Sequence, residues 1–283
     1  MALETEWRML VVLAHPDDET FGCGGTLAKY AHEGARVTLI CATRGEVGEI
    51  SDPSLAAQES LGEVREQELR NAANALGIQD VVLLGYRDSG MVGTADNEHP
   101  NAFAGASFDE VVSKVVRIVR EFRPQVILTF DENGGYGHPD HIMAHRAATE
   151  AYSAAADPLR YTEQLAEGLN AHATERLYNI GFTRSMVEEF RAAIRESSGE
   201  DPEGFDSEKF GIPDDQVTTV LDVSAYGDNK LRAALSHKTQ IRAGDDPFGW
   251  LPDRLKQRFL STEYLVRKSP PWQAGTPPET SLF

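Results

Sequence analysis

The stretch Met9–Leu13 (MLVVL), continued by Ala14–Glu19 (AHPDDE), decides how this chain folds. Its first part is a run of apolar residues, which predicts a buried strand. Its second part places one imidazole and three carboxylates directly after that strand, although ionisable groups beside a core are costly unless paired or bound to a metal. Open α/β sheets bind ligands beyond the carboxyl ends of their strands. The stretch therefore predicts a strand that ends at a functional site.

Beyond this stretch, short β-branched and apolar runs alternate with segments of helical period. Strands are expected near Met9–Ala14, Val37–Ala42, Val81–Gly85, Val126–Phe130, Leu177–Phe182 and Thr218–Val223. Helical patterns lie at Gly25–Glu33, Glu59–Leu76 and Phe108–Phe122. The alternation is typical of an α/β fold, and it predicts a Rossmann-like, mostly parallel sheet flanked by helices.

The chain of 283 residues is expected to form a single α/β domain over residues 1–268. Two stretches rich in Gly, Pro, Asn and Asp predict loop insertions near residues 89–107 and 197–216. Residues 269–283 begin with a Pro-rich segment that cannot continue a helix, so we expect an extended tail there.

The composition argues against several classes of partner. Lys plus Arg number 27 and Asp plus Glu 45, so the formal net charge of -18 repels phosphate backbones and anionic lipid surfaces. The two cysteines, Cys23 and Cys41, form no disulfide framework and no CxxC metal clip, which favours a reducing compartment. No stretch is apolar for about 20 residues, as a spanning helix requires. We expect a cytoplasmic protein that binds neither nucleic acid nor membrane, and the composition contains no signal for an oligomeric state.

A second polar cluster, Asp131–His141 (DENGGYGHPDH), follows the predicted strand Val126–Phe130. If the two strands are neighbours in a parallel sheet, both clusters lie at the same sheet edge. His15 and Asp18, three residues apart at the start of a helix, then join His141 in a set of two imidazoles and one carboxylate. That set suits a catalytic Zn2+ ion with an open position for water, and Fe2+ is the alternative ion.

Pro139 favours the first turn of a helix, and this separates the roles of the neighbouring histidines. His138 is expected at the helix cap, and His141 one turn inside the helix. His145 is expected to be a supporting or packing residue. The same structural role is expected of His99, His172 and His237.

The two polar clusters together resemble a known family. AHPDDE at residues 14–19 and NGGYGHPDH at residues 133–141 resemble the motifs of the PIG-L/LmbE-like zinc-dependent N-deacetylases. Within that family the chain is similar to the mycothiol branch. RDSGM at residues 87–91 resembles a motif of the N-acetylglucosaminyl-inositol deacetylase of that branch. REFRP (120–124), DENGGY (131–136) and LY (177–178) resemble motifs of its S-conjugate amidase. The likeness runs from the first strand to about Val266.

The resemblance implies that His15, Asp18 and His141 bind zinc and that Asp17 is the general base. Hydrolysis of an acetamide needs a nucleophile at neutral pH, and a zinc ion lowers the pKa of bound water to about 7. Asp17 is expected to accept the water proton and to pass it to the departing amine. Glu19 is expected to be an acid at a helix start, favoured by the helix dipole.

The resemblance also implies that His138 assists the leaving group or the oxyanion and that Tyr136 lies near the scissile carbonyl. Both are candidate donors to the oxyanion of the tetrahedral intermediate. Asp140 is expected to hydrogen-bond to His138, to orient its ring and to favour its protonated form.

Two further residues are assigned by the resemblance alone. It implies that Arg65 and Asp88 contact the hydroxyls of a sugar or cyclitol, so the expected partner is a small N-acyl amino sugar. From its own sequence context, Arg65 would be interpreted as a solvated charge on a helix.

Several alternatives stay open. Another N-acetyl sugar, such as a bacillithiol precursor, fits the same core. Two histidines and a carboxylate also form the facial triad of non-haem iron oxygenases, although those enzymes are usually β-rich barrels. A binding module without turnover would lack Asp17 or His138, and a dinucleotide-dependent dehydrogenase would need the GxGxxG fingerprint that Gly22–Gly25 does not complete.

Overall fold

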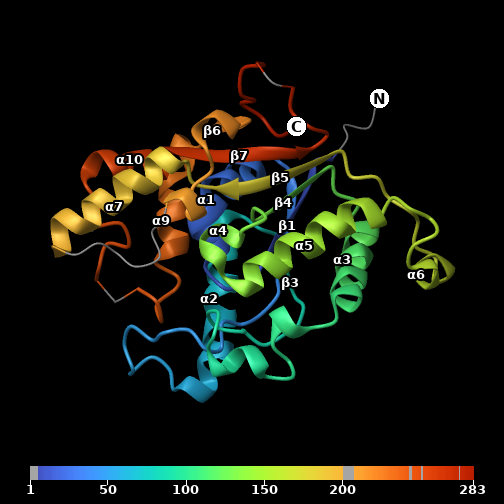
Figure 1. Ribbon diagram of the computed structural model, residues 1–283, viewed down its shortest axis with the longest axis horizontal. Helices are drawn as coiled ribbons and strands as arrows, with labels where there is room; N and C mark the ends of the chain where they lie inside the picture. Colours follow the sequence, from blue (N-terminus) through green and yellow to red (C-terminus); the bar gives the residue numbers. More distant parts are fainter. Residues whose placement is uncertain (1–5, 200–206, 242–243, 250, 274) are drawn as a thin grey trace.

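The computed structural model describes residues 6–199, 207–241, 244–249, 251–273 and 275–283. A seven-stranded sheet has the order β3-β2-β1-β4-β5-β7-β6 (Figure 1). Its strands are β1 (Arg8–Leu13), β2 (Arg36–Cys41), β3 (Asp80–Leu83), β4 (Val126–Thr129), β5 (Arg176–Gly181), β6 (Thr219–Asp222) and β7 (Thr262–Ser269). β1 to β5 run parallel, whereas β7 is antiparallel to β5 and β6. The predicted mostly parallel sheet is confirmed.

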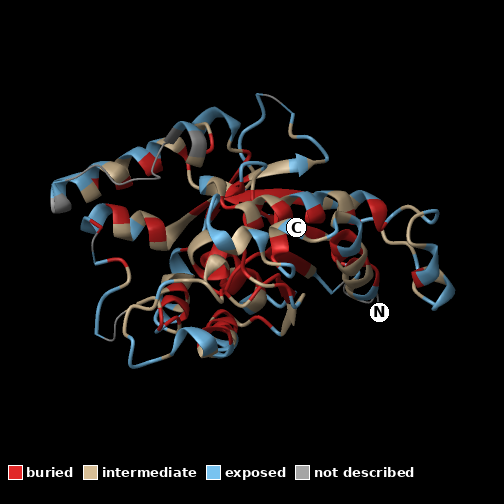
Figure 2. Ribbon diagram, turned by 60° about the horizontal axis from the view of Figure 1, so that its bottom comes forward, coloured by how far each residue is buried: buried red, intermediate tan, exposed pale blue. Residues whose placement is uncertain are grey.

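Helices cover both faces of this sheet. They are α1 (Asp18–His32), α2 (Leu61–Leu76), α3 (Phe108–Phe122), α4 (Gly134–Gly137), α5 (Pro139–Ala154), α6 (Thr162–Ala166), α7 (Arg184–Ser198), α8 (Ser207–Phe210), α9 (Gly227–Ala234) and α10 (Asp253–Ser261). α3 packs against α5 on one face, and α1, α2 and α9 pack together on the other. Figure 2 shows the buried strands between these layers. Because both faces are covered, β1 is a continuous apolar run rather than an alternating one.

The neighbouring strands β1 and β4 position the site. Their register pairs Met9 with Val126 and Val12 with Thr129, so the two strands end at the same sheet edge. The segments that follow them carry the two polar clusters. The sheet therefore brings the clusters together as the sequence predicts.

The first helix differs from the prediction. The expected helix at Gly25–Glu33 begins earlier, at Asp18, and bends at Cys23, whose φ is -152° and ψ 19°. The glycines that obscure the helical pattern allow close packing, since a Cβ on Gly25 would lie 2.6 Å from Val223 Cγ2. A tertiary contact, rather than a helix start, explains this part of the sequence.

The expected loops and tail contain more structure than their composition indicates. The loop near residues 89–107 includes 3-10 turns at Ala95–Glu98 and Phe103–Gly105. In the loop near 197–216, residues 200–206 lie outside the described residues, and α8 occupies part of the remainder. The tail is extended, but it returns to the sheet: the Glu279 amide donates to the Thr218 carbonyl, and Leu282 is fully buried.

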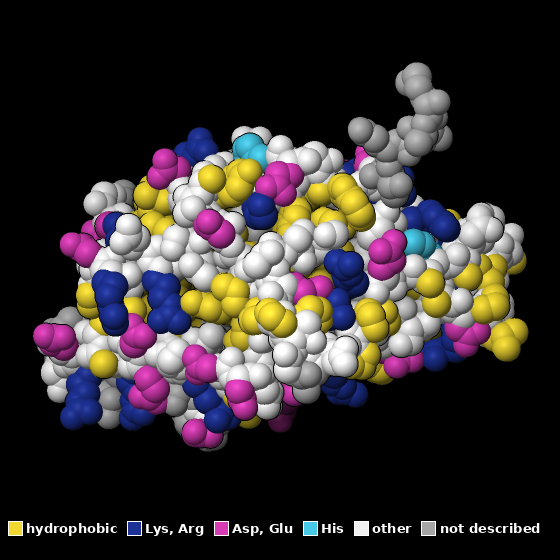
Figure 3. Space-filling view, turned by 90° about the horizontal axis from the view of Figure 1, so that it is seen from above, with side chains coloured by type: hydrophobic (Ala, Val, Ile, Leu, Met, Phe, Trp, Pro, Cys, Tyr) yellow, Lys and Arg dark blue, Asp and Glu magenta, His cyan; other side chains and the backbone are white. Residues whose placement is uncertain are grey.

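Two observations concern the surface. In the part of the chain that the structure describes, no helix is both long enough and apolar enough to span a bilayer. On the face shown in Figure 3, acidic and basic side chains are interspersed among apolar ones.

Candidate active site

The turn between β1 and α1 presents the first polar cluster. Asp18 is the first residue of α1, and its carboxylate folds back to accept hydrogen bonds from the amides of Ala14 (3.2 Å) and His15 (2.7 Å). The side chains of His15 and Asp18 are thereby held beside each other. The α5 helix supplies the third member, His141, from its first turn.

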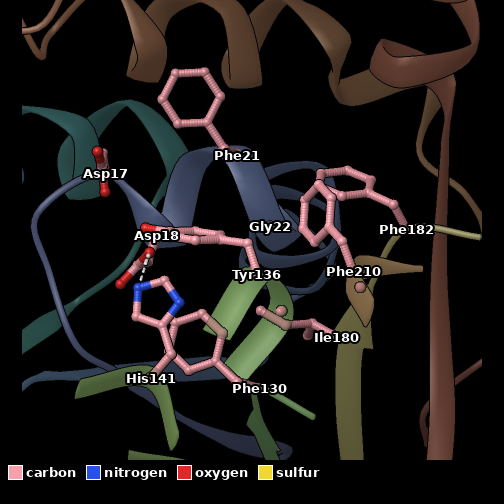
Figure 4. A pocket seen from close by; sticks show the side chains of 12 residues that line it. Asp17, Asp18, Phe21, Gly22, Phe130, Tyr136, His141, Ile180, Phe182 and Phe210 are labelled. Atoms are coloured by element: carbon pink, nitrogen blue, oxygen red, sulfur yellow. Dashed lines mark ion pairs between the residues drawn. The ribbon is translucent and has the colours of Figure 1, made fainter. Parts of the chain in front are cut away.

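Donor atoms of these three residues converge. His15 Nδ1 lies 3.1 Å from His141 Nε2 and 3.7 Å from Asp18 Oδ2. His141 Nε2 lies 3.3 Å from Asp18 Oδ1, and Figure 4 shows this pair as a dashed line. Donors that each bind one tetrahedral zinc ion at about 2.0–2.2 Å are about 3.3–3.6 Å apart. The spacing and chemistry of the three donors fit a divalent metal ion.

The outer ring nitrogens, His15 Nε2 and His141 Nδ1, have hydrogen-bond partners of their own. The inner nitrogens, His15 Nδ1 and His141 Nε2, are thereby available to a metal. His15 Nε2 faces Asp140 Oδ2 at 3.2 Å and Asp88 Oδ1 at 3.4 Å. His141 Nδ1 faces the Gly134 carbonyl at 3.2 Å. A proton on each of these outer nitrogens leaves the lone pair of the inner nitrogen free for a metal, which is how metal-binding histidines are commonly oriented.

Charge also gathers around His15. Burial disfavours its protonated form, but hydrogen bonds to Asp140 and Asp88 and the charge of Asp18 together raise its pKa well above the ordinary value. Burial and the nearby His15 lower the pKa of His141 to about 3. The site thus has carboxylates around the His15 imidazole and a neutral His141 imidazole. A bound cation would balance the charge of these carboxylates.

His138 caps α5 as predicted, but Asp140 acts on it differently from the prediction. The Asp140 backbone amide donates to His138 Nδ1 at 3.2 Å, whereas the Asp140 carboxylate contacts His15 and Ser89. Burial and the neighbouring histidines His15 and His141 lower the pKa of His138 to about 4. The expectation of a protonated ring held by the Asp140 carboxylate is wrong. The lowered pKa and the hydrogen bond accepted at Nδ1 favour a neutral His138 imidazole with its proton on Nε2.

His138 belongs to two other candidate donor sets. Ligand atoms lie within 4.8 Å of one another in the set of His15, His138 and His141 and in the set of His15, Asp88, His138 and Asp140. The cap hydrogen bond decides between them. A neutral His138 that accepts at Nδ1 carries its proton on Nε2, so neither nitrogen offers a free lone pair. Asp18 is therefore the better third ligand, and His138 is a hydrogen-bond donor.

Asp17 has a strained backbone beside this cluster. Its φ of 128° is rare outside glycine. The strain is held by Glu19, whose Oε2 accepts from the Asp17 amide at 2.9 Å. Burial, and next the charge of Asp18, raise the pKa of Asp17 to about 7. A carboxylate with a pKa near neutrality matches the requirements of a general base.

Asp17, Asp18 and Tyr136 lie between two cavities and line both of them. A cavity of about 360 Å³ is lined by His15, Asp17, Asp18, Val47, Gly48, Glu49, Arg65, Asp88, Gly90, Met91, Thr94, Asp96, Tyr136 and His138. Tyr136 is 47% exposed, and burial within its cavity together with the charge of Asp18 raises the pKa of its hydroxyl. The structure thus brings the predicted site residues around one centre.

Arg65 corrects the interpretation based on its sequence context. It is 6% exposed, and its guanidinium donates to the carbonyls of Gly45 and Glu49, each at 3.2 Å. It therefore is not a solvated helix charge, and it lines the polar cavity.

Sequence reasoning missed two supports of the site. Ser89 donates to Asp140 through both its amide (2.9 Å) and its hydroxyl (2.5 Å). His237, interpreted only as a structural residue, pairs with Glu19 at 2.8 Å, and Glu19 in turn holds Asp17. The adjacency of Ser89 to Asp88 was a local signal, whereas 218 residues separate Glu19 from His237.

Known proteins share the motifs and the fold. Residues 10–152 match the family model described as GlcNAc-PI de-N-acetylase, PIG-L. A 1D-myo-inositol 2-acetamido-2-deoxy-alpha-D-glucopyranoside deacetylase of Geodermatophilus obscurus is 45% identical, covering 92% of this chain and 92% of the relative. A relative of the same description from Thermobifida fusca is 42% identical, covering 98% of each chain.

A solved structure supports the fold. The N,N'-diacetylchitobiose deacetylase of Pyrococcus horikoshii matches with a TM-score of 0.66 and 21% identity, covering 93% of this chain and 84% of that chain. At this identity the likeness concerns the fold, whereas the matched family model and the relatives above establish kinship. The chain belongs to the GlcNAc-PI de-N-acetylase (PIG-L) family.

Proposed function

We propose that this chain is a metal-dependent amidohydrolase that removes the acetyl group from N-acetylglucosaminyl-inositol. The convergence of His15, Asp18 and His141 donors within 3.7 Å beside Asp17 carries the proposal. The names of the relatives support the substrate, because they describe the deacetylation of an inositol-linked 2-acetamido sugar.

His15, Asp18 and His141 would hold the metal, with zinc as the first choice and iron(II) as the alternative. When bound, the metal supplies Lewis acidity that makes a water molecule acidic near neutral pH. Asp88 and Asp140 keep the His15 ring oriented through its Nε2 atom. These carboxylates are positioning groups, because they act on the ligand rather than on the reacting amide.

Protein groups around the reacting amide complete the reaction. Asp17 takes a proton from the attacking water and delivers it to the amine as the C–N bond breaks. His138 Nε2–H donates to the carbonyl oxygen as negative charge develops there, and Tyr136 lines the same cavity as His138. Arg65 and Asp88 line the polar cavity, where hydroxyls of the glucosamine or inositol would bind.

The test combines metal content with amine release. Purified protein is expected to contain one metal ion per chain and to release amine from N-acetylglucosaminyl-inositol. Asp17→Asn is expected to keep the metal and lose activity by roughly 10²–10⁴-fold. His15→Ala is expected to lose the metal, while His32→Ala, a histidine elsewhere on α1 that contacts the Ala28 carbonyl, should keep both metal and activity.

Two results would contradict the proposal. Full turnover by Asp17→Asn would remove Asp17 from the reaction. Failure of the wild-type protein to bind zinc after reconstitution would show that the three donors do not form a metal centre.

A further inference from the structure

The reacting centre lies between two cavities, one with charged side chains and one that is mainly apolar. Asp17, Asp18 and Tyr136 line both cavities. The one on the side of His15 contains Arg65 and several carboxylates. The other, of about 200 Å³, is on the side of His141 and is mainly apolar. An amide cleaved at this centre has one substituent facing each cavity.

Aromatic and aliphatic side chains form the second cavity. Besides the residues at the centre it is lined by Phe21, Gly22, Phe130, Gly135, Ile180, Gly181, Phe182 and Phe210. Figure 4 shows the rings of Phe182 and Phe210 opposite Asp18, Tyr136 and His141. The Phe130 ring stacks on His141 with centroids 4.0 Å apart, so the apolar wall begins directly at a proposed metal ligand.

A further apolar cavity lies beside this one. It has a volume of about 150 Å³ and shares Phe21, Phe182 and Phe210 with the apolar cavity at the reacting centre. Its other lining residues are Phe190, Pro247, Phe248, Leu251 and Phe259. Phe190, Phe248, Leu251 and Phe259 belong to a hydrophobic cluster separate from the main core. The apolar cavity at the reacting centre therefore adjoins a second, aromatic cluster.

The geometry points to an acyl-binding pocket: this enzyme also hydrolyses glucosamine amides whose acyl group is an unbranched chain of four to eight carbons. The inference rests on the proposed amidohydrolase function. Water adds to the carbonyl carbon, the C–N bond breaks, and both protons of the water end on the departing nitrogen. The products are the amino sugar in its ammonium form and the chain as a carboxylate.

The polarity of each cavity indicates which substituent of the amide it binds, the sugar or the acyl chain. Sugar hydroxyls need hydrogen-bonding partners, which the Arg65 side supplies and the phenylalanine side does not. An acetyl methyl fills little of about 200 Å³, since about 10–15 Å³ already accommodates one water molecule. Each further methylene buried in the apolar cavity is expected to tighten binding about fourfold.

The activity test uses a series of N-acylglucosamines with acetyl, butanoyl, hexanoyl and octanoyl groups. With the zinc-loaded full chain, kcat/KM is expected to rise from acetyl to hexanoyl by at least about tenfold. Ile180→Phe narrows the pocket, and Phe210→Gln places an amide in a half-buried part of its wall. Each is expected to lower the hexanoyl-to-acetyl ratio by about tenfold. Leu159→Gln, the same kind of change at a side chain 83% exposed, should leave that ratio as in the wild type.

A binding test on metal-free protein separates this inference from the proposed function. Calorimetry is expected to show N-hexanoylglucosamine binding at least about tenfold more tightly than N-acetylglucosamine, with loss of the difference in Phe210→Gln. Tighter binding of the longer acyl chain, without amine release from any substrate, would contradict the proposed hydrolase function and support the acyl pocket. Hydrolysis of the acetyl substrate with no dependence on acyl length would overturn the acyl pocket. Tighter binding of octyl N-acetylglucosaminide, with no increase in affinity along the N-acyl series, would also overturn it.

Discussion

The buried pair formed by Glu19 and His237 shows how single residues support the site. Both side chains are fully buried, and His237 Nε2 lies 2.8 Å from Glu19 Oε1. Burial works against the Glu19 charge, but His237 holds the pKa of that carboxyl below its usual range. The other Glu19 oxygen accepts from the Asp17 amide. The interpretation of Glu19 as only a helix-dipole acid was incomplete.

Removing His237 is expected to destabilise the protein strongly. His237→Ala leaves the Glu19 carboxylate buried without its partner, which costs about 3–5 kcal/mol. His237→Gln retains a donor and should cost less. Urea unfolding of metal-free protein measures the difference in the free energy of unfolding. Equal stability of His237→Ala and wild type would show that the pair contributes nothing to the fold.

Asp140 provides a second prediction at the scale of one residue. Its carboxylate contacts His15 Nε2 and accepts from the Ser89 hydroxyl. Asp140→Asn weakens the orientation of a proposed ligand and is expected to lower zinc affinity by about 10–100-fold. Asp80→Asn, which alters an exposed pair with Arg36, is the control. Competition titration with a zinc chelator provides the measurement, and unchanged affinity in Asp140→Asn would contradict the role.

At the scale of elements, Arg120 connects α3 to the end of α5. Its side chain is 2% exposed. The guanidinium donates to the backbone carbonyls of Ala154, Ala155, Asp157, Arg160 and Tyr161. These include carbonyls at the C-terminus of α5 that a helix leaves without internal partners. The helix that carries His141 is therefore anchored at its far end.

Substitution of Arg120 tests this anchor. Arg120→Leu removes the donors to several buried carbonyls and is expected to lower the free energy of unfolding by about 3–5 kcal/mol. Arg117→Leu affects a side chain 39% exposed, with surface pairs to Glu121 and Glu167, and should cost less than about 1 kcal/mol. Urea denaturation compares the two. Similar losses in both variants would refute a specific role for Arg120.

The elements also show where patterns in the sequence failed. β1, β2 and β4 were recognisable because both of their faces are buried and most of their residues are apolar. β7 was missed, since it alternates buried and half-exposed positions and carries Arg267 and Lys268 near its end. It is paired antiparallel between β5 and β6, and this placement depends on partners far away in the sequence.

At the scale of the whole molecule, the tail closes the sheet edge. Arg267 pairs with Glu279 at 2.7 Å, and Arg176 donates to the Leu282 carbonyl at 2.6 Å. Leu282 itself is fully buried in the main core. The final residues therefore form part of the fold.

Leu282→Ala is expected to destabilise the protein by about 2–5 kcal/mol, because the buried side chain is replaced by a cavity. The melting temperature should fall by several degrees in calorimetry. Leu159→Ala, at a side chain 83% exposed, should change it little. A melting temperature of Leu282→Ala equal to that of wild type would show that the tail does not contribute to stability.

The sequence by itself determined the α/β class, the two polar clusters at strand ends, and the cap of α5 by His138 and Pro139. These depend on local patterns: apolar runs, spacing of three residues, and the fixed backbone angle of proline. Only the tertiary structure decided that the Asp140 carboxylate supports His15, that Arg65 is buried, and that His237 supports Glu19. Those contacts join segments that no local pattern connects, and burial in a shared core gives them their chemistry.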